Sequence, residues 1–76
     1  MKRGFIERHD LARSEWEQVL YQRISSERDR EIFERTHLDG VPYEQVAVEF
    51  DMSVRQIKAI AKTIEQEMEK HITHNL

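Results

Sequence analysis

The stretch that decides the fold is residues 41–64, which read VPYEQVAVEF, then DMS, then VRQIKAIAKTI. Apolar residues return every three or four positions on both sides of DMS, which is typical of two amphipathic helices. Asp51 tolerates the left-handed backbone of a tight turn, and Ser53 with Gln56 has the spacing of a capping box. The stretch therefore predicts a helix-turn-helix, a motif whose second helix enters the major groove of DNA.

Length and composition limit what can surround this motif. The 76 residues suffice for one small domain, and 36% charged residues with only two Gly and one Pro favour helices. There is no Cys, so disulfides and thiolate metal sites are excluded, and we expect neither a metal nor a cofactor. No apolar run is long enough for a membrane span and no signal peptide is evident, so we expect a cytoplasmic protein that avoids membranes.

The periodicity of the remaining chain predicts an all-α fold. We expect a single helical domain over 1–76, with a flexible arm at about 1–8 and a tail at about 73–76. Phe5 and Ile6 are apolar enough to anchor that arm to the core. The four expected helices, which include both helices of the motif, lie at about 10–24, 26–38, 42–50 and 53–71.

Capping residues support these boundaries. Asp10 or Ser14 can begin the first helix, and Ser14 with Glu17 has capping-box spacing. Ser26 with Asp29 begins the second helix. Gly40 suits the left-handed position after that helix, and Pro42 suits the first turn of the third.

The last predicted helix carries one apolar stripe that continues beyond the turns a DNA-reading helix needs. This stripe must be buried, and the apolar face of the first helix is the expected cover, either within the chain or across a dimer. Trp16 belongs in this contact and not on a nucleic-acid base, because Glu15 and Glu17 beside it would repel phosphate. The predicted partner or dimer interface comprises Trp16, Leu20, Ile64, Met68 and Ile72.

From about residue 26 to residue 68 the chain resembles region 4 of bacterial sigma factors. The matching segments are REIF at 30–33, LDGVPYEQVA at 38–47 and FDMSVRQIK at 50–58. The resemblance implies a module that reads the −35 promoter element, and not a complete sigma factor. The same type of helix-turn-helix recurs in response regulators and small phage proteins.

The resemblance also implies which residues touch DNA. By position, Arg55 and Lys58 would contact bases, and the guanidinium of Arg55 can bond guanine O6 and N7 together. Gln56 and Lys62 would contact phosphates or a neighbouring base. The start of the third helix, with its free backbone N–H groups, would lie against the DNA backbone. The implied DNA-binding residues are Tyr43, Gln45, Arg55, Gln56, Lys58 and Lys62.

Charge leaves two classes of function open. The net charge is −3, whereas a free-standing DNA binder is usually basic. The first class is a DNA-binding transcription module that works as a dimer or attached to RNA polymerase. The second is a phage or mobile-element type of module that binds RNA polymerase, a sigma factor or an anti-sigma factor without reading DNA. An enzyme is not expected, because the chain has no Gly-rich phosphate loop and no Cys nucleophile.

Overall fold

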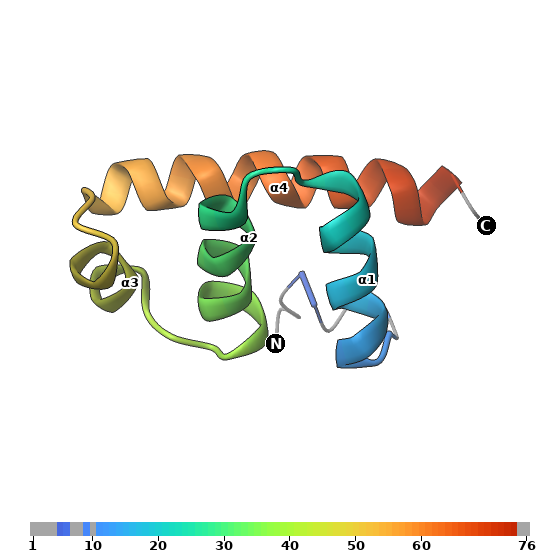
Figure 1. Ribbon diagram of the computed structural model, residues 1–76, viewed down its shortest axis with the longest axis horizontal. Coiled ribbons are helices and arrows are strands. Elements are labelled where there is room, and N and C mark those ends of the chain that lie inside the picture. The colour runs from blue at the N-terminus through green and yellow to red at the C-terminus, as the bar shows by residue number, and fades with distance from the viewer. Residues whose placement is uncertain (1–4, 7–8, 10, 75–76) are drawn as a thin grey trace.

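A single long helix supports the other three, as Figure 1 shows for the computed structural model. The structure describes residues 5–6, 9 and 11–74. Helix α4 runs the length of the molecule, and the three short helices lie side by side along one side of it. The all-α fold with four helices is confirmed, and the described residues form no strand. The helices are α1 (Arg13–Arg23), α2 (Glu27–Phe33), α3 (Tyr43–Glu49) and α4 (Val54–His74), with a π-helical turn η1 (Glu34–Leu38) that continues α2.

The predicted helix caps and turns are confirmed at four places. The Ser26 hydroxyl accepts the N–H of Asp29, which caps α2. Gly40 has a φ of +71° and Asp51 a φ of +53°, so both occupy the left-handed conformation that their turns require. At the start of α4, the Ser53 hydroxyl accepts the N–H of Gln56 at 3.1 Å, while the Gln56 side chain accepts the N–H of Ser53 at 2.9 Å. This reciprocal pair is the capping box.

The predicted start of the first helix was wrong. Helix α1 begins at Arg13 with Ala12 as its N-cap, and Ser14 lies exposed inside the first turn. The carboxylate of Glu15 accepts the N–H of Ala12 at 2.8 Å and so satisfies one of the unpaired donors at the helix start. Asp10, the other proposed cap, lies outside the described residues.

The third and fourth helices also differ slightly from their predicted bounds. Pro42 precedes α3 as its N-cap instead of occupying the first turn. Its carbonyl accepts the N–H groups of Gln45 and Val46, each at 3.1 Å. Helix α4 continues to His74, so the tail predicted from residue 73 was wrong for residues 73–74, and the rest of it lies outside the described residues.

The end of α2 widens into the π-turn η1, which the sequence did not predict. The Thr36 hydroxyl donates to the carbonyl of Ile32 at 2.9 Å, a bond from side chain to backbone that competes with the regular helix ladder. Beyond it, the N–H of Asp39 reaches back to the Glu34 carbonyl at 2.8 Å. The wide turn then closes at Gly40.

The core consists of two apolar clusters that meet on α4. The first lies between α1, α2 and α4 and also receives Phe5 from the N-terminal segment; the second lies between α2, α3 and α4. Ile60 on α4 packs against both. The buried members of the first are Phe5, Trp16, Leu20, Phe33, Ile64 and Met68, and those of the second are Ile32, Val46, Ala47 and Ile57.

The first cluster covers the apolar stripe of α4. Trp16 and Leu20 on α1 are each 1% exposed, and Met68 on α4 is fully buried. Ile64 belongs to the same cluster and Ile72 packs against it. The chain therefore covers the stripe by itself. The residues predicted as a partner or dimer interface would be accessible to another chain only if α1 moved away from α4.

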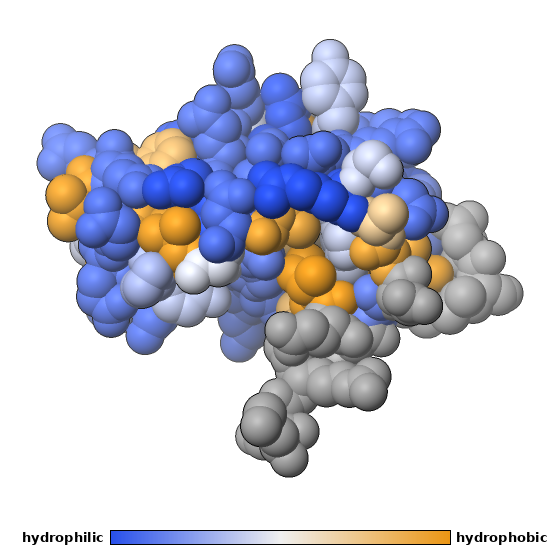
Figure 2. Space-filling model, turned by 90° about the horizontal axis from the view of Figure 1, so that it is seen from below, coloured by the Kyte–Doolittle hydropathy of each residue, from blue (hydrophilic) through white to orange (hydrophobic). Residues whose placement is uncertain are grey.

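Phe5 anchors the N-terminal segment, as the sequence allowed. Its ring centroid lies 5.5 Å from that of Trp16 and 6.3 Å from that of Phe33. The rest of the expected arm, apart from Ile6, lies outside the described residues. None of the described helices is long and apolar enough to cross a membrane. Seen from the side opposite α4, the surface is mostly hydrophilic with separate hydrophobic areas (Figure 2).

Candidate nucleic-acid interface

The outer face of α4 is the most distinctive surface of the molecule. Because α1, α2 and α3 all lie on one side of α4, its opposite face is uncovered along its length (Figure 1). Up to residue 70, the exposed side chains of α4 include four cations and no carboxylate. They are Arg55, Gln56, Lys58, Ala59, Lys62, Thr63, Gln66 and Lys70. We call this set the outer face.

The cations of the outer face are available to a ligand. Within the described part of the chain, no carboxylate forms an ion pair with any of the four. Arg13 and Arg35 elsewhere differ, because each holds two acidic side chains. At about 100° per residue, Arg55 and Lys62 lie within about 20° of each other around the helix, with Lys58 about 40° from Lys62. These three cations therefore project together from the first three turns of α4.

The glutamates of α4 are less exposed than the residues of the outer face. Glu65, Glu67 and Glu69 are all half-buried. The Oε2 atom of Glu65 lies 2.9 Å from Nε2 of His37, and that of Glu69 lies 2.9 Å from Nε2 of His9. Both histidines hold a carboxylate beside the outer face.

Tyr43 joins α3 to the outer face. The ammonium of Lys58 lies 5.9 Å from the centroid of the Tyr43 ring, within the range of a cation–π contact. Burial, and secondarily the nearby charge of Glu65, raise the pKa of the Tyr43 hydroxyl, so it stays a neutral hydrogen-bond donor. Tyr43 and Lys58, both predicted to touch DNA, are thus brought together.

Two other predicted contacts have roles within the fold. The side-chain oxygen of Gln56 is used in the capping box, although its amide nitrogen remains available. Gln56 also points about 100° away from Arg55 around the helix. Gln45 does not join the outer face, because its amide donates to Glu49 at 3.4 Å on the flank of α3 that faces η1.

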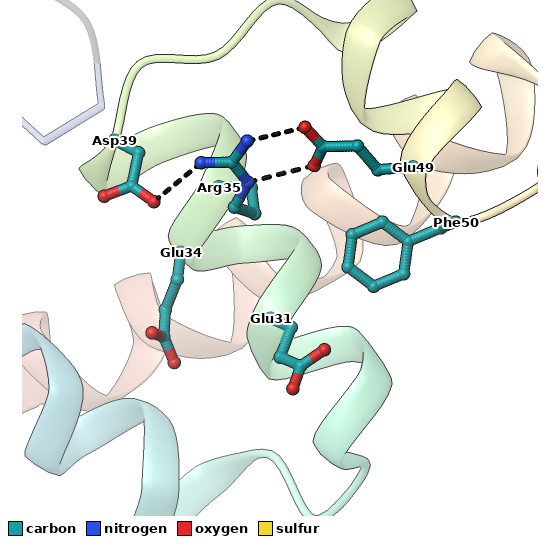
Figure 3. A pocket seen from close by; sticks show the side chains of 6 residues that line it. All are labelled: Glu31, Glu34, Arg35, Asp39, Glu49 and Phe50. Carbon is teal, nitrogen blue, oxygen red and sulfur yellow. Dashed lines mark hydrogen bonds and ion pairs between the residues drawn. The ribbon is translucent and has the colours of Figure 1, made fainter.

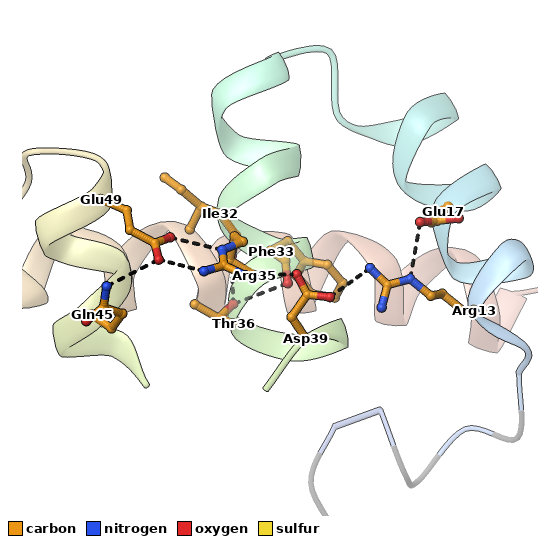
Figure 4. Close-up of polar contacts among 9 residues, drawn as sticks. All are labelled: Arg13, Glu17, Ile32, Phe33, Arg35, Thr36, Asp39, Gln45 and Glu49. Carbon is orange, nitrogen blue, oxygen red and sulfur yellow. Dashed lines mark hydrogen bonds and ion pairs between the residues drawn. The ribbon is translucent and has the colours of Figure 1, made fainter. Parts of the chain in front are cut away.

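A network of ion pairs fixes α3 relative to η1 and α1 (Figure 4). Arg35 donates to both carboxylate oxygens of Glu49, at 2.9 and 2.6 Å, and to Asp39 at 3.3 Å. Oδ1 of Asp39 also forms an ion pair with Nη2 of Arg13 at 2.9 Å. Arginines and glutamates alternate along α2 and η1, a spacing that favours ion pairs within one helix. Arg35 instead connects two elements, and so helps to set the angle at which α3 meets α4.

The same arginine lies in a pocket with an acidic lining, seen from close by in Figure 3. The pocket is lined by Glu31, Glu34, Arg35, Asp39, Glu49 and Phe50. Burial, and then the charge of Glu17, raise the pKa of Glu34. The guanidiniums of Arg13 and Arg35 lower the pKa values of Asp39 and Glu49 respectively. The pocket is therefore lined by the ion pairs that hold α3 in place, and it lies apart from the outer face.

Comparison with protein-family models, with curated proteins and with solved structures found no match for this chain. The candidate interface therefore depends on its own geometry. Sequence reasoning found Arg55, Lys58 and Lys62 but left Gln66 and Lys70 out of the set. Their positions were readable, since Lys62, Gln66 and Lys70 are spaced by four residues, the spacing of one helix face.

Proposed function

We propose that this chain binds double-stranded DNA, with α3 and α4 acting as a helix-turn-helix of the sigma region 4 type. The observation that carries the proposal is the outer face of α4, in a chain of net charge −3: its exposed charged residues are four cations, and none of them forms an ion pair within the described part of the chain. Phosphate neutralisation by Lys and Arg supplies much of the affinity of such proteins. A face whose exposed charged residues are all cations, in a molecule of negative net charge, fits a polyanion.

In this proposal the first turns of α4 enter the major groove. Arg55 reads a guanine through its two-pronged guanidinium, and Lys58 reads a neighbouring base. Lys62 contacts a phosphate. The Tyr43 hydroxyl at the start of α3 donates to the DNA backbone, and its ring holds Lys58 in place.

The net charge also bears on how the module works. One cationic face on an acidic chain gives weak affinity at physiological salt, because few counterions are released. We therefore propose that the module acts as a dimer or attached to RNA polymerase or another transcription protein. In either arrangement a second contact supplies the affinity that one outer face lacks.

Binding of labelled duplex DNA, followed by fluorescence anisotropy, tests the proposal. A random-sequence duplex should bind at about 50 mM salt and dissociate steeply as salt rises. On a site enriched from a random pool, Arg55→Ala should cost about 1–3 kcal/mol of binding free energy and relax the preference at one position. Lys58→Ala should weaken binding on the same site.

The control is Gln18→Glu, which lowers the net charge by one on an exposed position of α1. It should bind nearly as the parent protein does, since Gln18 lies on a different helix from the outer face. Absence of binding at low salt would reject the proposal. So would affinities for Arg55→Ala and Lys58→Ala that match those of the control.

The acidic remainder of the molecule favours a second candidate. A chain of net charge −3 that buries its apolar stripe internally could use this fold to bind RNA polymerase, a sigma factor or an anti-sigma factor without DNA. A pull-down with isolated RNA polymerase subunits separates the two candidates. Capture of a subunit together with absent duplex binding would select the protein-binding module.

A further inference from the structure

We infer that the DNA-contacting surface does not end with the first turns of α4 but continues along the outer face to Lys70, so that the duplex backbone follows the helix. This inference rests on the proposed function and extends it. It adds Gln66 and Lys70 as phosphate contacts, which neither the motif nor the family resemblance supplies.

The spacing along α4 supports a continuous contact. Lys62, Gln66 and Lys70 succeed one another at four-residue intervals, and each is exposed. From Arg55 to Lys70 the helix advances about 22 Å, more than the two or three turns that base reading requires. Around the helix, Arg55, Lys62, Gln66 and Lys70 lie within about 80° of one another. A single straight surface therefore carries all four.

Nothing in the described fold covers the distal part of that surface. Helices α1, α2 and α3 meet α4 from the opposite side, as Figure 1 shows. Three glutamates lie near the distal cations in azimuth: Glu69 is about 20° from Lys62, Glu65 about 60° from Lys62, and Glu67 about 60° from Lys70. All three are half-buried, and Glu65 and Glu69 are held by His37 and His9. Lys62, Gln66 and Lys70 are all exposed, so a ligand that lies along α4 reaches each of them.

The charge pattern identifies the occupant as a polyanion with regularly spaced charges. A second copy of this chain, placed outer face to outer face, would bring cations against cations. An apolar partner helix would find only Ala59 and the Thr63 methyl on this face. Duplex DNA fits, because its phosphates follow one another along the groove and can be met in turn by Lys62 and Lys70, with Gln66 donating between them.

Salt dependence of binding provides the test, with the full chain and a random duplex of about 24 base pairs. Each phosphate contact contributes about 0.9 to the slope of log affinity against log salt. Lys70→Gln should therefore make the slope shallower by about one, so that the parent loses about 3.5-fold more affinity than the variant between 50 and 200 mM salt. Base preference on an enriched site should not change, because a phosphate contact carries no sequence information.

Two matched variants complete the experiment. Lys70→Arg keeps the charge and should keep the parent slope, whereas Gln18→Glu changes the net charge as Lys70→Gln does and should also keep it. A parent-like slope for Lys70→Gln would end the interface before residue 70 and overturn the inference. An equal loss of slope in Gln18→Glu would overturn it too. If the parent protein does not bind at low salt, the proposed function itself fails, which is a distinguishable result.

Discussion

Single residues in this chain act mainly where the backbone must turn. Gly40 follows η1 with a φ of +71°, and Asp51 precedes α4 with a φ of +53°. A side chain at a left-handed position strains the backbone unless, like Asn or Asp, it can bond locally. The two turns therefore differ in tolerance. Asp51 is already a residue that accepts this conformation, whereas Gly40 accepts it without cost.

Replacing Gly40 shows how much the left-handed turn contributes. A Cβ added there would meet no atom within 4 Å, so steric contact plays no part and only backbone strain remains. We expect Gly40→Ala to lower the free energy of unfolding by about 1 kcal/mol, measured by urea denaturation. Gly40→Asn should cost less. Equal stability of all three proteins would mean that the turn does not require a positive φ.

The helices show where sequence patterns were sufficient and where they were not. Apolar periodicity located all four helices and their buried faces, because burial in a helix repeats every three to four residues. The start of α1 was misplaced, since Ser14 offered a cap that the Glu15 carboxylate made unnecessary. The π-turn η1 was missed because neither it nor the Thr36 hydroxyl bond within it leaves a signal in the apolar periodicity.

Two serines test the helix starts directly. Ser26→Ala removes the hydroxyl that caps α2 and should cost about 1 kcal/mol of unfolding free energy. Ser14→Ala should change stability by less than about 0.5 kcal/mol, because Ser14 is exposed within α1 and caps nothing. Thermal or urea denaturation of both variants measures the difference. A loss at Ser14 as large as that at Ser26 would place the start of α1 where the sequence first suggested.

Contacts between distant helices set the arrangement of the domain, and these were the least predictable features. The partners of His9 and His37 lie on α4, far along the chain, so spacing alone could not pair them. Arg35 likewise joins Glu49 on α3, in addition to Asp39 at the end of its own turn. The candidate site was partly readable, because its cations share one helix and one face. The contacts that hold Glu65 and Glu69 beside that face could be found only from the fold.

The network around Arg35 predicts how stability responds to acid. Hydrogen bonds from Arg13 and Arg35 lower the pKa values of Asp39 and Glu49 in the folded state below their ordinary values. Such carboxylates stabilise the fold above their unfolded pKa, and this stabilisation is lost as the pH falls and they become protonated. Glu34 opposes this trend, because its raised pKa makes its ionised form unfavourable in the fold.

A comparison of variants separates these opposing effects. Between about pH 5 and pH 3, the parent should lose stability more steeply than Arg35→Gln, in which Asp39 and Glu49 have lost a common partner. Glu34 remains in both proteins and its contribution largely cancels. Arg28→Gln removes an arginine outside the network and should follow the parent. Parallel curves for parent and Arg35→Gln, measured by denaturation at each pH, would contradict the role given to the network.

The dependence of three short helices on α4 has a consequence for synthesis on the ribosome. Translation produces α1, α2 and α3 first, and each is too short to be stable alone in water. Their shared partner is made last, so Trp16, Phe33 and Val46 stay without their core until α4 leaves the exit tunnel. Domains generally fold as units during synthesis. This one should wait for α4 and then fold in a single step.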